Sequence, residues 1–395
     1  MSYYTALNRR LSIIVIHYVS FKLINKKHYP LKLRKDLNKR YTTTMNKDMI
    51  DLYTDYQLSS FGQTTATGLS AMMEGSISHD AVTRFLTNSE YTSKHLWQQV
   101  KPTIRDIENE DGVLIFDDTI QAKPHTKENE TNCWHYDHTT NTTVKGINLL
   151  NCLYHCEGVS LPIAFHIVTK PICYSDISTR KTKRKATITK NELLRDMVDT
   201  ACHNQVKFRY VLMDSWFTSK QTLKHIRKKD KHVIAALKSN RLIALNLQDK
   251  KQSRYQRIDE IGLPDKKATT GYLKDYPHKV VFIRQVFTNK DGSLGVLYLV
   301  CTDSQLPADK IMSLYEKRWA IEVFHKSLKQ NASLAKSPAH SKRAMHNHVF
   351  LSICATVKLE CLKLTTKLNH FALKAKLLVA ASKAAFDELT LLRAA

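Results

Sequence analysis

Five short apolar runs in the middle of the chain constrain its fold more than any other feature of the sequence. Each has four to eight residues, the length of a buried strand rather than of a helix. Two segments with helical periodicity, 190–202 and 219–229, separate the last three runs. Strands and helices in this order are typical of a mixed α/β layer fold. The predicted strands are Val113–Phe116, Gly146–Leu153, Leu161–Val168, Tyr210–Met213 and Val233–Leu237.

The chain is strongly basic, with 61 Lys and Arg against 36 acids and a formal net charge of +25. Such a surface attracts a polyanion, either nucleic acid or an anionic membrane, before any specific contact forms. The sequence has no run of 18 or more apolar residues, so we expect no transmembrane helix, a nucleic-acid partner and a cytoplasmic location. Its eight cysteines form no CxxC pair, which favours reduced thiols over a zinc site.

The N-terminal quarter predicts a basic extension followed by helices. Residues 1–44 carry ten Lys or Arg and one acid, and we interpret them as a disordered basic tail, as an upstream in-frame extension, or as an arm that contacts the DNA backbone. Apolar residues recur at helical spacing from Met45, so 45–105 is expected to be a helical DNA-binding region. Gly75 and Ser78 suit the end of one helix and the N-cap of the next. This pattern fits a helix-turn-helix and equally any helical hairpin.

The C-terminal half predicts an interrupted core and a helical end. Residues 239–295 alternate polar and apolar side chains between glycines and prolines, which predicts a β-rich insertion before a further strand at 296–302. The core then comprises 106–238 and 296–338. Residues 339–395 are expected to be helical and to support dimerisation.

Carboxylates stand where two of the apolar runs end. Asp117 and Asp118 follow the run that ends at Phe116, and Asp214 follows the run that ends at Met213. In open α/β sheets, functional groups lie beyond the carboxyl ends of the strands. An Asp at such a place also commonly caps a turn, so neither position identifies an active site by itself.

One face of a long helix, predicted over 307–330, is polar. Four of its side chains fall within an arc of about 60°. They are Tyr315, Arg318, Glu322 and Lys329. An apolar stripe lies beside this arc, so the polar face is expected to border the core and to look into a cleft. A solvated face with an Arg318–Glu322 ion pair is the alternative.

The helix and the two strand ends carry the motifs of a known family in the expected order. The sequence YEKRWAIEVFHKSLK (315–329) resembles the Tyr-x2-Arg-x3-Glu-x6-Lys signature of insertion-sequence transposases of the DDE superfamily. FDDT and LMDSWF resemble the first-acid and second-acid motifs of that branch. The resemblance spans about residues 45–363. It implies an RNase H-like mixed sheet flanked by helices, with a β-rich insertion and helical N- and C-terminal regions.

The resemblance also implies an activity and a set of catalytic acids. Asp117, Asp214 and Glu322 would hold two Mg²⁺ or Mn²⁺ ions, since hard cations choose carboxylate oxygen. The protein would be a prokaryotic transposase that cleaves double-stranded DNA at the inverted repeats of its element. It would then join the freed 3′-hydroxyl to target DNA, as a homodimer in the DNA complex.

Further residues are expected at the DNA surface. By the same resemblance, Tyr315 and Arg318 would contact phosphates near the transposon end, and Lys329 would bind the end itself. A basic loop is expected to grip phosphates as well, if it lies beside the site. Its basic residues are Arg180, Lys181, Lys183, Arg184 and Lys185.

Three alternatives stay open at this level. Asp118 competes with Asp117 as the first acid, and the two would point to opposite faces of the sheet. The Asp-x-Thr pattern, completed by Thr119, favours Asp117. A DNA-binding relative that has lost catalysis and an RNase H-like nuclease without end preference are the other readings. The nuclease reading leaves the face with Tyr315, Arg318 and Lys329 unexplained.

Overall fold

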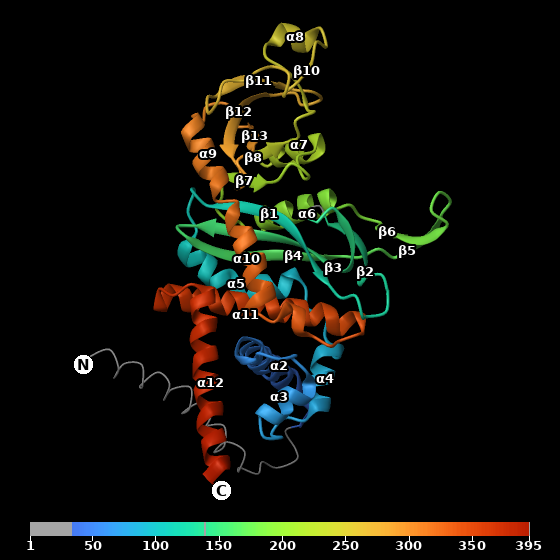
Figure 1. Cartoon of the computed structure of the whole chain (residues 1–395), viewed down its shortest axis with the longest axis vertical. Coiled ribbons are helices and arrows are strands. Elements are labelled where there is room, and N and C mark those ends of the chain that lie inside the picture. Colours follow the sequence, from blue (N-terminus) through green and yellow to red (C-terminus); the bar gives the residue numbers. More distant parts are fainter. Residues whose placement is uncertain (1–33, 138–139, 395) are drawn as a thin grey trace, which may run out of the picture. The chain divides into compact units, whose positions relative to one another are not determined.

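The computed structural model of the chain describes residues 34–137 and 140–394, with side chains from residue 47 onward (Figure 1). A first unit ends at Ile50, and a larger unit starts at Asp51. Helix α2 (Arg34–Ser59) includes both Met45 and this boundary, so the predicted start of the folded unit lies inside a helix. Residues 1–33, most of the predicted basic extension, lie outside the described residues.

A mixed sheet of eleven strands forms the centre of the larger unit, as far as its described residues show. Ten strands follow the order β10-β9-β11-β12-β13-β8-β7-β1-β3-β2, and β4 also pairs with β3. The strands are β1 (Val113–Ala122), β2 (Cys133–Asp137), β3 (Thr142–Cys156), β4 (Val159–Val168), β7 (Tyr210–Met213), β8 (His232–Leu237), β9 (Leu242–Ala244), β10 (Gln256–Arg257), β11 (Thr269–Leu273), β12 (Lys279–Thr288) and β13 (Leu294–Cys301).

Strands β4, β3, β1, β7 and β8 are the five that the apolar runs predict. β1 runs antiparallel to β3 and parallel to β7, and β7 runs parallel to β8. β1 and β3 are longer than their apolar runs because they pair with each other from Val113 to Ala122. The mixed α/β architecture is confirmed. The sheet, with helices on its faces, is compatible with an RNase H-like fold.

Helices cover both faces of β1, β3 and β4 (Figure 1). On one side lie α5 (Ser93–Ile107), α10 (Trp319–Gln330) and α11 (Lys342–Thr366), which contact β4. On the other side α6 (Lys190–His203) packs against β3 and β4, beside α7 (Lys220–Lys228). α6 and α7 coincide with the two helices predicted from periodicity. The acids of β1 therefore lie between the sheet and a layer of helices, whichever face of the strand they project from.

The insertion predicted over 239–295 is β-rich, but its strands belong to the same sheet as the core. β12 pairs with β13, and β13 pairs with β8, so the hydrogen-bond ladder continues from the core into the insertion. The short helix α8 (Leu247–Lys251) contacts β9 and β11 at the far end of this ladder. The further strand predicted at 296–302 is β13.

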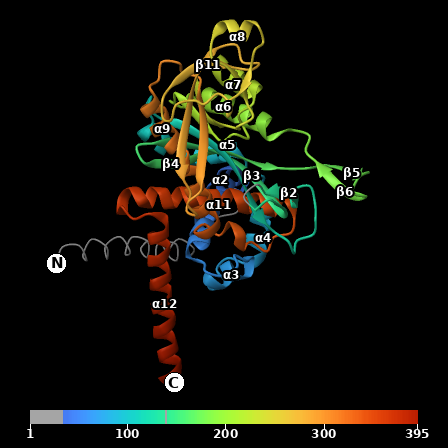
Figure 2. The same ribbon diagram turned by 45° about the horizontal axis from the view of Figure 1, so that its top comes forward.

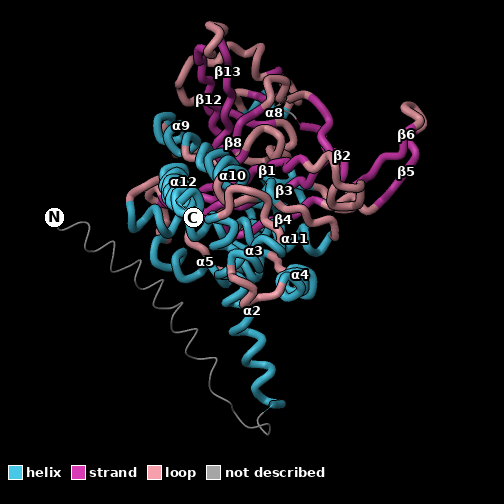
Figure 3. The backbone as a smooth tube through the Cα atoms, turned by 60° about the horizontal axis from the view of Figure 1, so that its bottom comes forward, coloured by secondary structure: helices cyan, strands magenta, loops and turns pink. Residues whose placement is uncertain are grey.

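The basic segment expected to be a loop is a β-hairpin. β5 (Ile172–Asp176) pairs antiparallel with β6 (Lys181–Lys185) in a separate two-stranded sheet. The loop prediction was wrong because lysine is disfavoured in strands, and only the cross-strand pairing reveals the ladder. Figure 3 shows the hairpin extending away from the large sheet.

The predicted helical hairpin before the core is present. It consists of α3 (Ala66–Met72) and α4 (His79–Asn88). Gly75, in the connection, has a φ of 73°, which a glycine adopts without strain. The Ser78 side chain accepts a hydrogen bond from the backbone N–H of Ala81 and so caps α4.

Two long helices, α11 and α12 (His370–Ala394), follow the core. α11 is buried along most of its length and contacts α4, α5 and β4. Of the described α12 residues, Leu373 alone is buried, and Figure 2 shows the helix extending away from α11. No helix in the described ranges has both the length and the apolar character that a membrane span requires.

A buried histidine connects α11 with two other elements. Nδ1 of His348 lies 3.2 Å from the Tyr53 hydroxyl and 3.3 Å from Nε2 of Gln57, both on α2. Nε2 lies 3.0 Å from the backbone carbonyl of Ser333, which precedes the 3₁₀ turn η2 (Leu334–Lys336). Burial lowers the pKa of His348 to about 4. The imidazole is therefore neutral at pH 7, with Nε2–H donating to Ser333.

We predict that His348 makes the fold sensitive to mild acid. In the unfolded chain its pKa returns to about 6.5, so below pH 6.5 the unfolded state binds a proton that the folded state refuses. The free energy of unfolding should therefore fall by about 2 kcal/mol between pH 7 and pH 5 through this residue. His348→Gln should show a smaller fall than the wild type in urea denaturation at the two pH values. Equal pH dependence in both proteins would contradict the assignment.

Candidate active site

The parallel register of β1 and β7 brings two acids together. Phe116 is paired with Met213, and the next residue on each chain segment is Asp117 and Asp214. β7 ends there because Oδ1 of Asp214 accepts hydrogen bonds from the backbone N–H groups of Trp216 (2.9 Å) and Phe217 (3.4 Å). Asp214 therefore follows the end of its strand as predicted.

The sequence predicted that Asp117 follows the end of a strand, but in the structure it does not lie at a strand end. β1 continues to Ala122, because the pairing with β3 extends beyond the point where β7 stops. Asp117 thus occupies the middle of a long strand, beside the position where its shorter neighbour ends. On one side, its backbone pairs with β3. On the other side, the neighbouring strand has ended, and Asp214 follows that end.

Burial and mutual repulsion disfavour full ionisation of these carboxylates. Burial, and then the charges of Asp214 and Asp118, raise the pKa of Asp117 to about 7. Burial also raises the pKa of Asp214, against the opposing effect of the two N–H groups that it accepts. The guanidinium of Arg318 lowers both pKa values. Clustered acids with such shifts are typical of sites that transfer protons or bind a cation.

Asp118 points to the opposite face, toward α6, where its charge is already balanced. The Lys190 ammonium lies 2.8 Å from its Oδ1, and the side-chain amide of Asn148 donates to its Oδ2 at 2.7 Å. The same ammonium lies 4.4 Å from the centre of the Trp216 ring. With both oxygens engaged, Asp118 fits a structural role better than Asp117 does, which favours Asp117 as the first acid.

The single helix predicted over 307–330 is two helices. α9 (Ala308–Glu316) ends before Lys317, and α10 begins at Trp319. At the junction the backbone N–H groups of Lys317 and Arg318 donate to carbonyls three residues earlier, so one turn is tightened to 3₁₀ geometry. The prediction failed because no glycine or proline marks the break. Tyr315 therefore lies on α9, while Glu322 and Lys329 lie on α10.

Arg318 lies between the third predicted acid and the two aspartates. Its Nη2 donates to Oε1 of Glu322 at 2.7 Å, and its guanidinium carbon lies 5.6 Å from the centre of the Tyr315 ring. Burial raises the pKa of the Tyr315 hydroxyl, and the charges of Asp214 and Asp117 contribute to that shift. Nε of Arg318 is buried and has no hydrogen-bond partner. The guanidinium therefore keeps one donor that no described group satisfies.

Glu322 does not converge with Asp117 and Asp214 in this structure. It pairs with Arg318, and no three His, Cys, Asp or Glu residues within the described ranges form a group that could hold a metal ion. Lys329 lies in the last turn of α10, and burial lowers the pKa of its ammonium. The structure thus places Asp117 and Asp214 together. Glu322 pairs instead with Arg318, whose charge also acts on both aspartates.

A buried polar contact that the sequence reading missed fixes α10 to the sheet. Asn151 on β3 is the cross-strand partner of Asp117, and its side-chain Nδ2 lies 3.0 Å from Nε2 of His325. Burial lowers the pKa of His325 to about 3, so the neutral ring accepts this hydrogen bond. His325 follows Glu322 by one helical turn. An Asn within an apolar run and a His on an apolar stripe were the available signals.

The five basic residues predicted to bind DNA lie on the β5–β6 hairpin and not among the acids. Arg184 is engaged with the body of the protein, because its Nε lies 3.1 Å from Oε1 of Glu128. Lys183 pairs with Asp176 at 2.5 Å. The exposed residues of the set are Arg180, Lys181 and Lys185.

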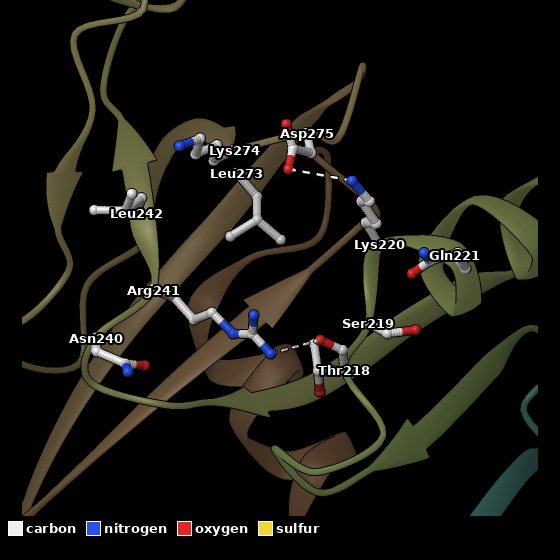
Figure 4. A pocket seen from close by; sticks show the side chains of 10 residues that line it. All are labelled: Thr218, Ser219, Lys220, Gln221, Asn240, Arg241, Leu242, Leu273, Lys274 and Asp275. Carbon is white, nitrogen blue, oxygen red and sulfur yellow. Dashed lines mark hydrogen bonds and ion pairs between the residues drawn. The ribbon is translucent and has the colours of Figure 1, made fainter. Parts of the chain in front are cut away.

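A pocket of about 440 Å³ begins four residues after Asp214. Three basic side chains, Lys220, Arg241 and Lys274, are among its lining residues (Figure 4). Arg241 donates to the carbonyl of Thr218 at 3.2 Å, and Lys220 lies 3.4 Å from Asp275. The N-terminus of α7 also lies here, so the pocket is electropositive, and its first lining residue is close in sequence to Asp214.

Comparison with known proteins identifies the region that contains these acids. The family described as DDE superfamily endonuclease matches residues 33–262, more than half of the chain. The match includes Asp117 and Asp214 and ends before Glu322. No curated protein matches the chain. With its paired aspartates inside the matched region, the chain belongs to the DDE superfamily of endonucleases.

Proposed function

We propose that this protein is a transposase that cleaves double-stranded DNA at the ends of its element and joins the freed 3′-hydroxyl to target DNA. The observation that carries the proposal is the half-buried pair Asp117 and Asp214, faced by the Arg318–Glu322 pair on the adjoining helix. Family membership supports an endonuclease acting on DNA. The end-specific cleavage and the strand transfer follow from the resemblance of residues 315–329 to the transposase signature.

The acid pair fits a hard divalent cation. Both groups offer only oxygen donors, and burial together with the charges of neighbouring carboxylates raises their pKa values, which a bound cation would reverse. We infer that Asp117 and Asp214 hold Mg²⁺ or Mn²⁺ and that Glu322 completes a site for two ions. When bound, the ions supply the positive charge that cleavage of a phosphodiester requires.

The other polar residues of α9 and α10 position the DNA. The guanidinium of Arg318 has a fork of donors, and Nε is still unpaired, so it suits a phosphate oxygen. A phosphate bound there competes with Glu322 for Arg318 and leaves the Glu322 carboxylate available to the acid pair. Tyr315, whose ring centre lies 5.6 Å from the guanidinium carbon of Arg318, would contact the same stretch of backbone, and Lys329 adds a positive charge two turns beyond Glu322.

The first prediction concerns the cation. Mg²⁺ or Mn²⁺ should stabilise the wild-type protein, by about 2.7 kcal/mol at an ion concentration a hundredfold above Kd, because the folded state alone presents the paired acids. Asp117→Asn and Asp214→Asn should lose this effect in calorimetric unfolding at pH 8.

Asp118→Asn is the matched control, since it removes the neighbouring carboxylate on the opposite face. It should keep the stabilisation by the ion, whatever its effect on the metal-free protein. Loss of the effect in Asp118→Asn, with retention in Asp117→Asn, would reverse the assignment of the first acid.

The second prediction concerns cleavage. With DNA that carries the ends of the element, Asp214→Ala and Glu322→Ala should abolish metal-dependent cleavage, whereas Glu316→Ala, an exposed acid at the end of α9, should not. Arg318→Ala should slow single-turnover cleavage by about 100-fold, with DNA affinity nearly unchanged, because it stabilises charge at the reacting phosphate.

The outcome also separates the rival functions. Binding without cleavage by the wild type would favour a DNA-binding relative that has lost catalysis. Cleavage of any duplex at equal rates would favour a nuclease without end specificity. If Arg318→Ala lost only affinity, its assignment to the reacting phosphate would be wrong.

The homodimer expected in the DNA complex has a candidate surface on α12. The last part of this helix, 375–394, is exposed, and its apolar residues Leu378, Ala385 and Leu392 recur every seven residues. Leu389 lies beside them, whereas Lys383 and Asp387 lie on the opposite side of the helix. A stripe with this spacing suits a helix of a second copy.

We predict that α12 carries the dimer contact. Leu389→Glu places a charge within the apolar stripe and should convert the protein–DNA complex from a dimer to a monomer in light scattering. Lys383→Glu changes charge on the opposite side and should leave the dimer intact. A dimer that survives Leu389→Glu would exclude α12 as the contact.

A further inference from the structure

The β5–β6 hairpin, residues 172–185, has no role in the fold of the sheet. Its two strands pair only with each other among the described strands, and the figures show it extending outward beyond β2 (Figures 1 and 3). Two hydrogen bonds of Arg184 hold its base: Nε donates to Glu128 at 3.1 Å, and Nη1 donates to the carbonyl of Lys170 at 3.4 Å. The hairpin is thus an arm with a fixed base.

One face of the arm alternates positive and apolar side chains. Ile172 is opposite Lys185, Tyr174 is opposite Lys183, and Asp176 is opposite Lys181, and opposite residues project from the same face of a ladder. Ile172 and Tyr174 are 47% and 44% exposed. Three lysines and one acid on this face suit a polyanion, and a two-stranded ribbon has the width to enter a groove of DNA.

The tip of the arm holds an isoleucine out in solvent. Asp176 accepts hydrogen bonds from the Ser178 hydroxyl (2.6 Å), from the backbone N–H of Thr179 (2.9 Å) and from Lys183 (2.5 Å), which fix the turn. Ile177 in this turn is 95% exposed, more than any other large apolar residue described. Burial of an aliphatic side chain of this size is favourable, and the described part of the fold provides none for Ile177.

We propose that Ile177 is a wedge that the hairpin inserts between neighbouring base pairs of duplex DNA, while its lysine face follows the phosphate backbone. Partial unstacking buries the isoleucine against the bases and kinks the duplex, as apolar wedges on other DNA-binding proteins do. The hydrogen bonds that Asp176 accepts hold the turn from which this side chain projects. This inference rests on the proposed function, because it takes DNA as the partner.

The test uses the full-length protein in a chelator, so that no strand is cut, and a short duplex with a fluorescent donor and acceptor at its ends. Binding of the wild type should bring the ends closer, by a kink of about 20–90°. Ile177→Asn should bind with the same salt dependence, since no charge is lost, but should leave the duplex straight. Ile177→Leu should restore the kink, and Lys181→Ala should keep it while lowering the salt slope by about one.

The outcomes separate this inference from the proposed function. A kink in the Ile177→Asn complex equal to that of the wild type, or a straight duplex in the wild-type complex, would overturn the wedge and leave DNA binding intact. A wild-type protein that binds no DNA would overturn the proposed function, and the wedge with it.

Discussion

The parallel pairing of β1 with β7 is the constraint on which the site depends. It places Asp117 and Asp214 side by side at the point where the shorter strand ends. A shift of one residue would present Asp118 instead, because side chains alternate between the faces of a strand. Asp118 faces α6 and is neutralised by Lys190, so only the observed register gives two neighbouring acids with raised pKa values.

Burying two neighbouring carboxylates is electrostatically unfavourable, and the surrounding charges offset this only in part. Arg318 lowers the pKa of both aspartates, but it also binds Glu322, so its charge is shared among three carboxylates. The hydrogen bond between Asn151 and His325 keeps α10 against β3, and it adds no charge to the site because both side chains are neutral. A site with unresolved repulsion is less stable than it could be, which is typical of sites shaped by a ligand that they must bind.

Much of the fold could be predicted from the sequence, because each buried core strand contains a continuous run of apolar residues. Val113–Phe116 and Tyr210–Met213 were found in this way, and Asp214 follows the second run as expected. What the sequence did not show depends on pairing between distant segments. The extension of β1 past Asp117, the hairpin at Lys181–Lys185 and the continuity of the insertion with the sheet all follow from ladders that no local pattern encodes. The 3₁₀ turn at Arg318 likewise lacks a local breaker, so a single helix was the natural prediction.

We propose above all that Asp117 and Asp214 are the shared ligands of a divalent cation. The most direct test is the anomalous scattering of Mn²⁺ in crystals of the protein bound to an end of its element. We expect a manganese peak between the carboxylates of Asp117 and Asp214, with Glu322 turned from Arg318 toward the ion. A manganese peak on Asp118 would contradict this assignment. So would crystals that contain bound manganese but show none in contact with Asp117 and Asp214.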